Sequence, residues 1–256
     1  MNLSIDAGSK STELREQTIG AALDATVERF GGREALVVPH QDVRQTWREF
    51  AASVDDVAKG LLAAGIEQGD RVGMWSPNYA EWVYVQFATA KIGAIQVNVN
   101  PAYRTNELQY ALAQSGCRLL VTRTSHLTSE YRSMVDEISA EVPGLERVVY
   151  FDTDDWAGMI DAGQTISDER LVEAGAALAL TDPINIQYTS GTTGFPKGAT
   201  LSHRNILNNA LAVASSCGYD ETDRVGIPVP FYHCFGMVMG NLACAATGAT
   251  MVIPSP

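Results

Sequence analysis

Hydrophobic residues recur along the chain with two different spacings. From Ile19 to Phe30 they fall at helical spacing, behind Thr18 as a candidate N-cap and ahead of a Gly31-Gly32 stop. The same spacing predicts further helices, over residues 48–64, 79–91, 105–114, 128–141, 205–216 and 237–246. Short runs rich in β-branched residues predict the strands, over residues 34–38, 43–47, 71–76, 94–99, 118–121, 147–151, 184–189, 225–228 and 250–253.

The order of these elements predicts the fold class. Strands and helices alternate after residue 71, which is typical of an α/β fold with mainly parallel sheets flanked by helices. The polar residues 1–15 are expected to form a flexible N-terminal arm. Residues 152–183 are acidic and rich in Ala and Gly, so they predict a long connection with little core of its own. The sequence stops at MVIPSP, directly after an expected core strand, which favours a fragment.

Composition narrows the class of protein. The 256 residues are 46% hydrophobic and 19% charged, which is typical of a globular chain. A net charge of −12 argues against nucleic-acid binding, and any anionic substrate must then meet local positive charge or backbone N–H groups. Four cysteines without CxxC spacing favour reduced thiols over a disulfide framework or a zinc site. With no signal peptide and no apolar run long enough for a membrane span, we expect a cytoplasmic protein; peripheral membrane contact and oligomerisation stay open.

One short segment, QYTSGTTGFPKG at residues 187–198, carries candidate chemistry. It is not a Walker A loop, because Pro196 stands where the second glycine should be, and it lacks the G-x-G-x-x-G of dinucleotide loops. Gly191 and Gly194 let backbone N–H groups approach phosphate oxygens, and Lys197 supplies a positive charge. On composition alone, the competing interpretation is a surface turn rich in Ser, Thr and Gly.

The same segment resembles the signature of the adenylate-forming superfamily, which includes acyl-CoA synthetases, firefly-type luciferases and the adenylation domains of peptide synthetases. The resemblance continues through residues 199–205 and through PFYHCFG at residues 230–236. Upstream, residues 69–82 resemble an early strand–helix unit of the family. Residues 92–108 are most similar to the medium-chain fatty-acyl-CoA synthetases. Nearly the whole chain is covered, from about residue 16.

The resemblance implies both a fold and a reaction. Residues 16–256 would be the front portion of the large N-terminal AMP-binding domain of an acyl-CoA synthetase-like fold, incomplete and without the C-terminal domain. Members of the family convert a fatty acid and Mg·ATP to acyl-AMP and pyrophosphate, and then form a thioester with coenzyme A. Because later motifs of the family are missing before Pro256, the resemblance implies a fragment that is inactive alone.

The resemblance also implies site residues. Those expected to hold the phosphates of ATP are Thr189, Ser190, Gly191, Thr192, Thr193, Gly194, Phe195, Pro196 and Lys197. Thr193 would also face Mg²⁺. His233 would lie beside the acyl carboxylate, although without the motif a histidine used for packing or capping is the commoner interpretation. Tyr232, Phe235 and Met237 could wall an acyl tunnel or be plain core. His203, Trp75 and Trp82 are expected to be structural.

Two other functions stay open. The chain could be a non-catalytic module that binds nucleotide or acyl groups, because the later motifs are missing. It could also belong to an aryl-acid–CoA ligase, because the far wall of the pocket lies outside this sequence. An amino-acid substrate is disfavoured, since residues 230–237 lack the aspartate that would hold an α-amino group.

Overall fold

The computed structural model describes residues 13–189 and 196–256. Its α-helices are α1 (Ile19–Phe30), α2 (Trp47–Ala63), α3 (Ala80–Ile92), α4 (Thr105–Ser115), α5 (Tyr131–Ile138), α6 (Asp154–Gly163), α7 (Asp168–Ala176), α8 (His203–Cys217) and α9 (Ala243–Thr247). Short 3₁₀ turns cover Pro39–Gln41 and Ser139–Glu141, and Phe235–Leu242 form a π-helix. The strands are β1 (Glu34–Val38), β2 (Val43–Thr46), β3 (Arg71–Trp75), β4 (Ile95–Val99), β5 (Cys117–Thr122), β6 (Arg147–Tyr150), β7 (Pro183–Thr189), β8 (Lys197–Ser202), β9 (Arg224–Gly226) and β10 (Thr250–Val252).

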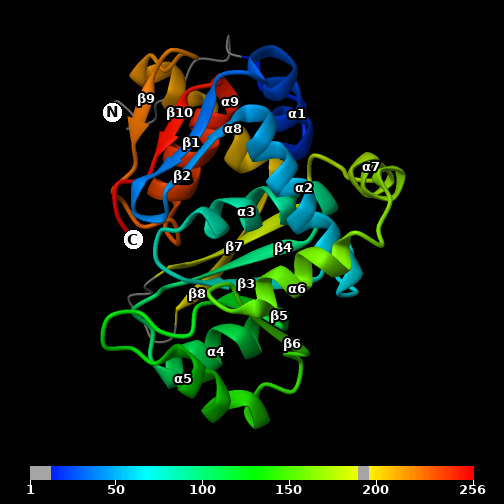
Figure 1. The fold of residues 1–256 in the computed structure, drawn as a ribbon, viewed down its shortest axis with the longest axis vertical. Coiled ribbons are helices and arrows are strands. Elements are labelled where there is room, and N and C mark those ends of the chain that lie inside the picture. Colours follow the sequence, from blue (N-terminus) through cyan, green and yellow to red (C-terminus); the bar gives the residue numbers. More distant parts are fainter. Residues whose placement is uncertain (1–12, 190–195) are drawn as a thin grey trace, which may run out of the picture.

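In the described residues the strands form two sheets (Figure 1). The larger has the order β6-β5-β3-β4-β7-β8, in which only the edge strand β8 runs antiparallel to its neighbour. The smaller has the order β2-β1-β10-β9, with β2 antiparallel to β1 and the other pairs parallel. The predicted α/β class, with mainly parallel sheets flanked by helices, is therefore confirmed.

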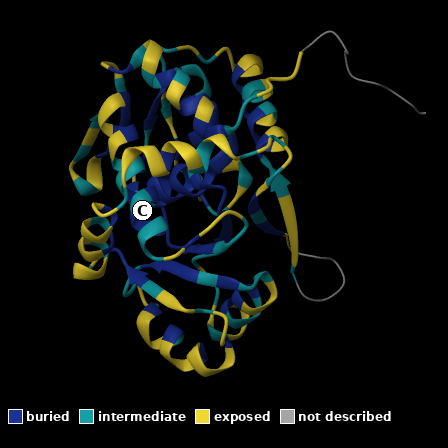
Figure 2. Ribbon diagram, turned by 90° about the vertical axis from the view of Figure 1, so that its right-hand side faces the viewer, coloured by how far each residue is buried: buried dark blue, intermediate teal, exposed yellow. Residues whose placement is uncertain are grey.

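Helices cover both faces of the larger sheet. α4 and α5 lie on one face, while α2, α3 and α6 lie on the other (Figure 1). α3 runs between the two sheets, and nearly all of its residues are buried, as expected of a helix that is apolar all round. Trp75 and Trp82 are fully buried, which confirms their expected place in the core. Figure 2 shows the buried residues along the middle of the molecule, beneath helices with exposed outer faces.

The expectation that residues 152–183 form a long connection is wrong, although few of these residues are buried, as expected. Two helices lie in this stretch, α6 behind the N-cap Thr153 and α7 behind the N-cap Ser167. α6 packs tightly on α2, because a Cβ added at Gly163 would lie 2.7 Å from the backbone nitrogen of Gly60. Met159 of α6 is fully buried in the contact. Glycine at the crossing lets the two backbones approach, which a sequence pattern alone does not reveal.

Two other expectations change in detail. The expected helix over residues 237–246 is divided into the π-helix and α9, and its first turn starts two residues earlier. The expected helix over residues 128–141 is shorter, because α5 begins at Tyr131 behind a loop in which Leu127 adopts a positive φ of 53°. The expected N-terminal arm falls mostly on residues 1–12, outside the described part of the chain.

Candidate functional site

The candidate site lies where several parallel strands end. β3, β4 and β7 run in the same direction, so their carboxyl ends meet at one edge of the larger sheet, where ligands bind in open α/β folds. Two segments meet this edge. One is residues 189–197, called here the glycine loop, which reaches this edge through its described residues Thr189, Pro196 and Lys197. The other is residues 229–237, called here the histidine segment.

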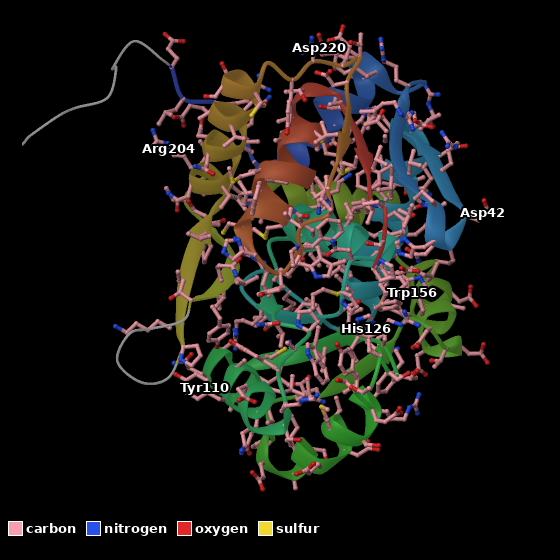
Figure 3. The ribbon with its side chains drawn as sticks, turned by 90° about the vertical axis from the view of Figure 1, so that its left-hand side faces the viewer. Asp42, Tyr110, His126, Trp156, Arg204 and Asp220 are labelled. Carbon is pink, nitrogen blue, oxygen red and sulfur yellow. The ribbon has the colours of Figure 1, made fainter. Side chains whose placement is uncertain are left out.

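The glycine loop joins two antiparallel strands. β7 ends at Thr189 and β8 begins at Lys197, and these two residues are directly paired. Both are exposed, and the Thr189 hydroxyl donates to the Lys197 carbonyl over 3.4 Å. The carbonyl of Pro196 accepts a hydrogen bond of 3.1 Å from the hydroxyl of Tyr110, which ties the loop to α4 (Figure 3). The predicted phosphate ligands outside the described residues are Ser190, Gly191, Thr192, Thr193, Gly194 and Phe195.

The histidine segment presents His233 to solvent. The His233 Nδ1 accepts the backbone N–H of Phe235 over 3.1 Å, so the proton of the neutral ring sits on Nε2 and can be donated to a ligand. Its carbonyl accepts from the backbone nitrogens of Gly236 and Met237. The turn needs glycine, because a Cβ at Gly236 would lie 2.5 Å from the carbonyl oxygen of Pro230.

The proposed walls of an acyl tunnel lie in different environments. Met237 is buried in the core, Tyr232 is half-buried, and Phe235 is 53% exposed. Burial raises the pKa of the Cys234 thiol, the residue after His233. A thiol in that state stays protonated at neutral pH and is a poor nucleophile. The exposed imidazole of His233 is therefore the candidate for chemistry in this segment.

Buried carboxamides hold the histidine segment in place, and these are the residues that sequence reasoning missed. Asn78 donates to the Val229 carbonyl and accepts the Phe231 N–H, both at 2.9 Å. Gln86 donates to the Met237 carbonyl at 3.0 Å. Asn98 of β4 and Gln187 of β7 both donate to the Tyr232 carbonyl. The sequence carries no decisive signal for Asn98 and Gln187, because amides at every second position of a strand are also typical of its solvent-facing side.

His203 is structural, as expected. It lies at the first position of α8 and is completely buried. Its Nδ1 accepts the backbone N–H of Ile19 over 3.2 Å, which connects the starts of α8 and α1.

In the described residues no group of three or more His, Cys, Asp or Glu side chains is arranged to hold a metal ion. Within the same residues, no helix combines the length and apolar character needed to cross a bilayer.

Comparison with known proteins agrees with this geometry. The family model described as AMP-binding enzyme matches residues 23–256, and the chain belongs to this family. It is 41% identical to the medium-chain acyl-CoA ligase ACSF2, mitochondrial, of Danio rerio over 97% of this chain and 44% of the relative. It is 40% identical to the putative acyl-CoA synthetase YngI of Bacillus subtilis over 94% of this chain and 47% of the relative.

One solved structure that is similar to this chain is the inhibitor-bound N-terminal domain of FACL13 from Mycobacterium tuberculosis. That domain superposes with a TM-score of 0.81 at 26% identity, over 94% of this chain and 57% of the other. The chain spans about half the length of the curated relatives it matches. The adenylate-forming resemblance and the fold class are both confirmed by these matches.

Proposed function

We propose that the full-length protein is a fatty acid–CoA ligase that acts on medium-chain fatty acids. In the first step a carboxylate oxygen attacks the α-phosphorus of ATP, and the bond to pyrophosphate breaks. In the second step the thiol sulfur of coenzyme A attacks the acyl carbonyl, loses its proton and displaces AMP. This chain would supply the phosphate-binding loop and part of the acyl site, and we expect it to be inactive alone.

The observation that carries the proposal is the position of His233. It is exposed at the carboxyl edge of the sheet, on a segment hydrogen-bonded to the strand that leads into the glycine loop. A donor on His233 Nε2 could hold the carboxylate of the acid near the phosphates of ATP. Such placement of reacting groups accounts for a large part of enzymatic rate enhancement.

The glycine loop would hold the β- and γ-phosphates. The net charge of the chain is −12, so binding a polyanion requires local positive charge, and Lys197 is exposed at the end of the loop. Mg²⁺ would offset phosphate charge when bound. The ion would enter with ATP, and Thr193, outside the described residues, is its proposed protein contact.

The test is acyl-adenylate formation by the full-length protein, trapped with hydroxylamine. Lys197→Ala should lower the rate by roughly 10²–10³, as expected for loss of one charge-stabilising group in the transition state. Lys59→Ala is the matched control, because it removes the same charge from a residue paired with Asp168 on the far-lying α7. Equal rates for the two variants would contradict the role of Lys197.

A panel of acids tests the substrate class. Medium-chain fatty acids should give the highest rates, a preference for benzoate-type acids would favour the aryl-acid alternative, and no hydroxamate with any acid would favour a non-catalytic module.

For the compartment we propose the cytoplasm, because all four cysteines are free thiols. The name of the zebrafish relative includes "mitochondrial", so microscopy of the tagged full-length protein is the test.

A further inference from the structure

The carbonyl of Tyr232, the residue before His233, receives two side-chain donors from neighbouring strands. Gln187 Nε2 of β7 donates over 2.6 Å, and Asn98 Nδ2 of β4 donates over 3.2 Å. Both side chains are buried, so water does not replace these bonds easily. A carbonyl oxygen has two lone pairs, and this one is therefore satisfied entirely from the sheet.

The two donors cannot turn away, because their own oxygens are occupied. Asn98 Oδ1 accepts from Gln96 Nε2 at 3.0 Å and from Asn185 Nδ2 at 2.9 Å. Gln187 Oε1 accepts from Asn98 Nδ2 at 3.2 Å and from the Cys234 thiol at 3.5 Å. Each amide must then point its NH₂ group toward the histidine segment. The backbone carbonyl of Tyr232 can only accept, so it also fixes which end of each of these two amides faces it.

Gln187 links the two halves of the candidate site. It lies two residues before Thr189, where the glycine loop begins, and its backbone is paired with Ala199 of β8. Its side chain ends on the peptide that leads into His233. The side-chain bonds between the strand that ends at Thr189 and the histidine segment thus run through Gln187, and the bond of 2.6 Å to the Tyr232 carbonyl is the shorter of the two. Such a bond weakens steeply when it is stretched or bent.

We propose that Gln187, supported by Asn98, is a positioning residue that sets the separation between Thr189, at the end of β7, and His233. This inference rests on the proposed function. The loop would hold ATP and His233 would hold the carboxylate, so the link determines how close the carboxylate oxygen lies to the α-phosphorus. A misplacement of about 1 Å can lower a rate roughly 10²-fold.

The test variant is Gln187→Met, which keeps the length of the side chain and removes the donor. Thr122→Val is the matched control, because it deletes a buried hydroxyl that donates to the Trp75 carbonyl, at the same edge of the sheet but away from the histidine segment. If the methionine variant does not fold, Gln187→Glu replaces it. Hydrogen–deuterium exchange of residues 229–237 in the 256-residue chain should be about tenfold faster in the Gln187 variant than in the control.

The second readout is the kinetics of the full-length protein. With Gln187→Met, kcat for hydroxamate formation should fall about 10- to 100-fold, while KM for ATP and for the acid stays near the wild-type value, because each substrate keeps its own contacts. A kcat equal to that of Thr122→Val would overturn the inference. If the wild type forms no hydroxamate, the proposed function fails separately; equal exchange rates in the two variants would then overturn the link itself.

Discussion

Acidification should destabilise the fold through His203. The buried ring accepts the N–H of Ile19 on Nδ1, and it lies at the start of α8 beside the start of α1. A protonated ring would lose this acceptor and place a positive charge at the positive ends of two helix dipoles. Burial lowers the pKa of His203 from its ordinary value of 6.5 to about 4.

The direction and the size of this pH effect follow from the difference between the pKa values of His203 in the folded and unfolded states. Because the pKa of His203 is lower in the folded state, the unfolded state takes up the proton first as pH falls. The stabilisation is therefore complete above pH 6.5 and is lost progressively as pH falls toward 4. Between pH 8 and pH 5, the two pKa values correspond to a loss of about 2 kcal/mol in the free energy of unfolding.

The assay is urea unfolding of the 256-residue chain at pH 8 and pH 5, beside His203→Asn. An asparagine oxygen can accept near the position of Nδ1, and the residue does not titrate. The wild type should lose about 2 kcal/mol more than the variant over this range. The pKa values of His40 and His126 are also lowered, chiefly by burial, but these residues titrate in both proteins and cancel. Equal losses in the two proteins would refute the assignment to His203.

Two further substitutions test the packing. Gly236→Ala should cost roughly 1–3 kcal/mol of stability in urea unfolding and slow adenylation by the full-length protein, because its Cβ would meet the Pro230 carbonyl. The control Gly226→Ala, where the Cβ enters open space, should change neither the stability nor the rate. Equal behaviour of the two variants would contradict the tight turn. Met159→Ala should cost about 2–5 kcal/mol in the same assay, because the side chain is fully buried between α6 and α2. The control Val172→Ala, on the exposed face of α7, should cost almost nothing. A Met159 variant as stable as the wild type would show that α6 is not part of the core.

Local signals predicted the elements that they control. Thr18 caps α1 as expected, because its side chain accepts the N–H of Ala21 three residues later. α6 and α7 also have caps, at Thr153 and Ser167, but both helices are short, and acidic residues are interspersed with their apolar ones. They pack on helices that are distant in sequence, α6 on α2 with the close approach of Gly163 to Gly60, and α7 mainly on α3.

The residues of the candidate site also divide into those that a local sequence motif predicts and those that depend on contacts between distant segments. The glycine loop and His233 could be proposed from a motif, because the relevant residues are adjacent in the sequence. The carboxamides could not, because Asn98 and Gln187 alternate with apolar residues as the solvent-facing side of a strand would. Only the tertiary structure places the histidine segment over that side of the sheet. The π-helix at Phe235–Leu242 also departs from the period that a sequence pattern detects.

The smaller sheet has a consequence for how the protein is made. β1 and β2 form a hairpin, and a lone hairpin is marginally stable in water. The Thr250 hydroxyl that reaches the Glu34 carbonyl from β10 comes from a residue 216 positions later. At ribosomal rates this delay is roughly 10–40 s, during which β1 has an unpaired edge that another chain could pair with. Chaperone binding to the nascent chain should therefore matter most before β9 and β10 emerge.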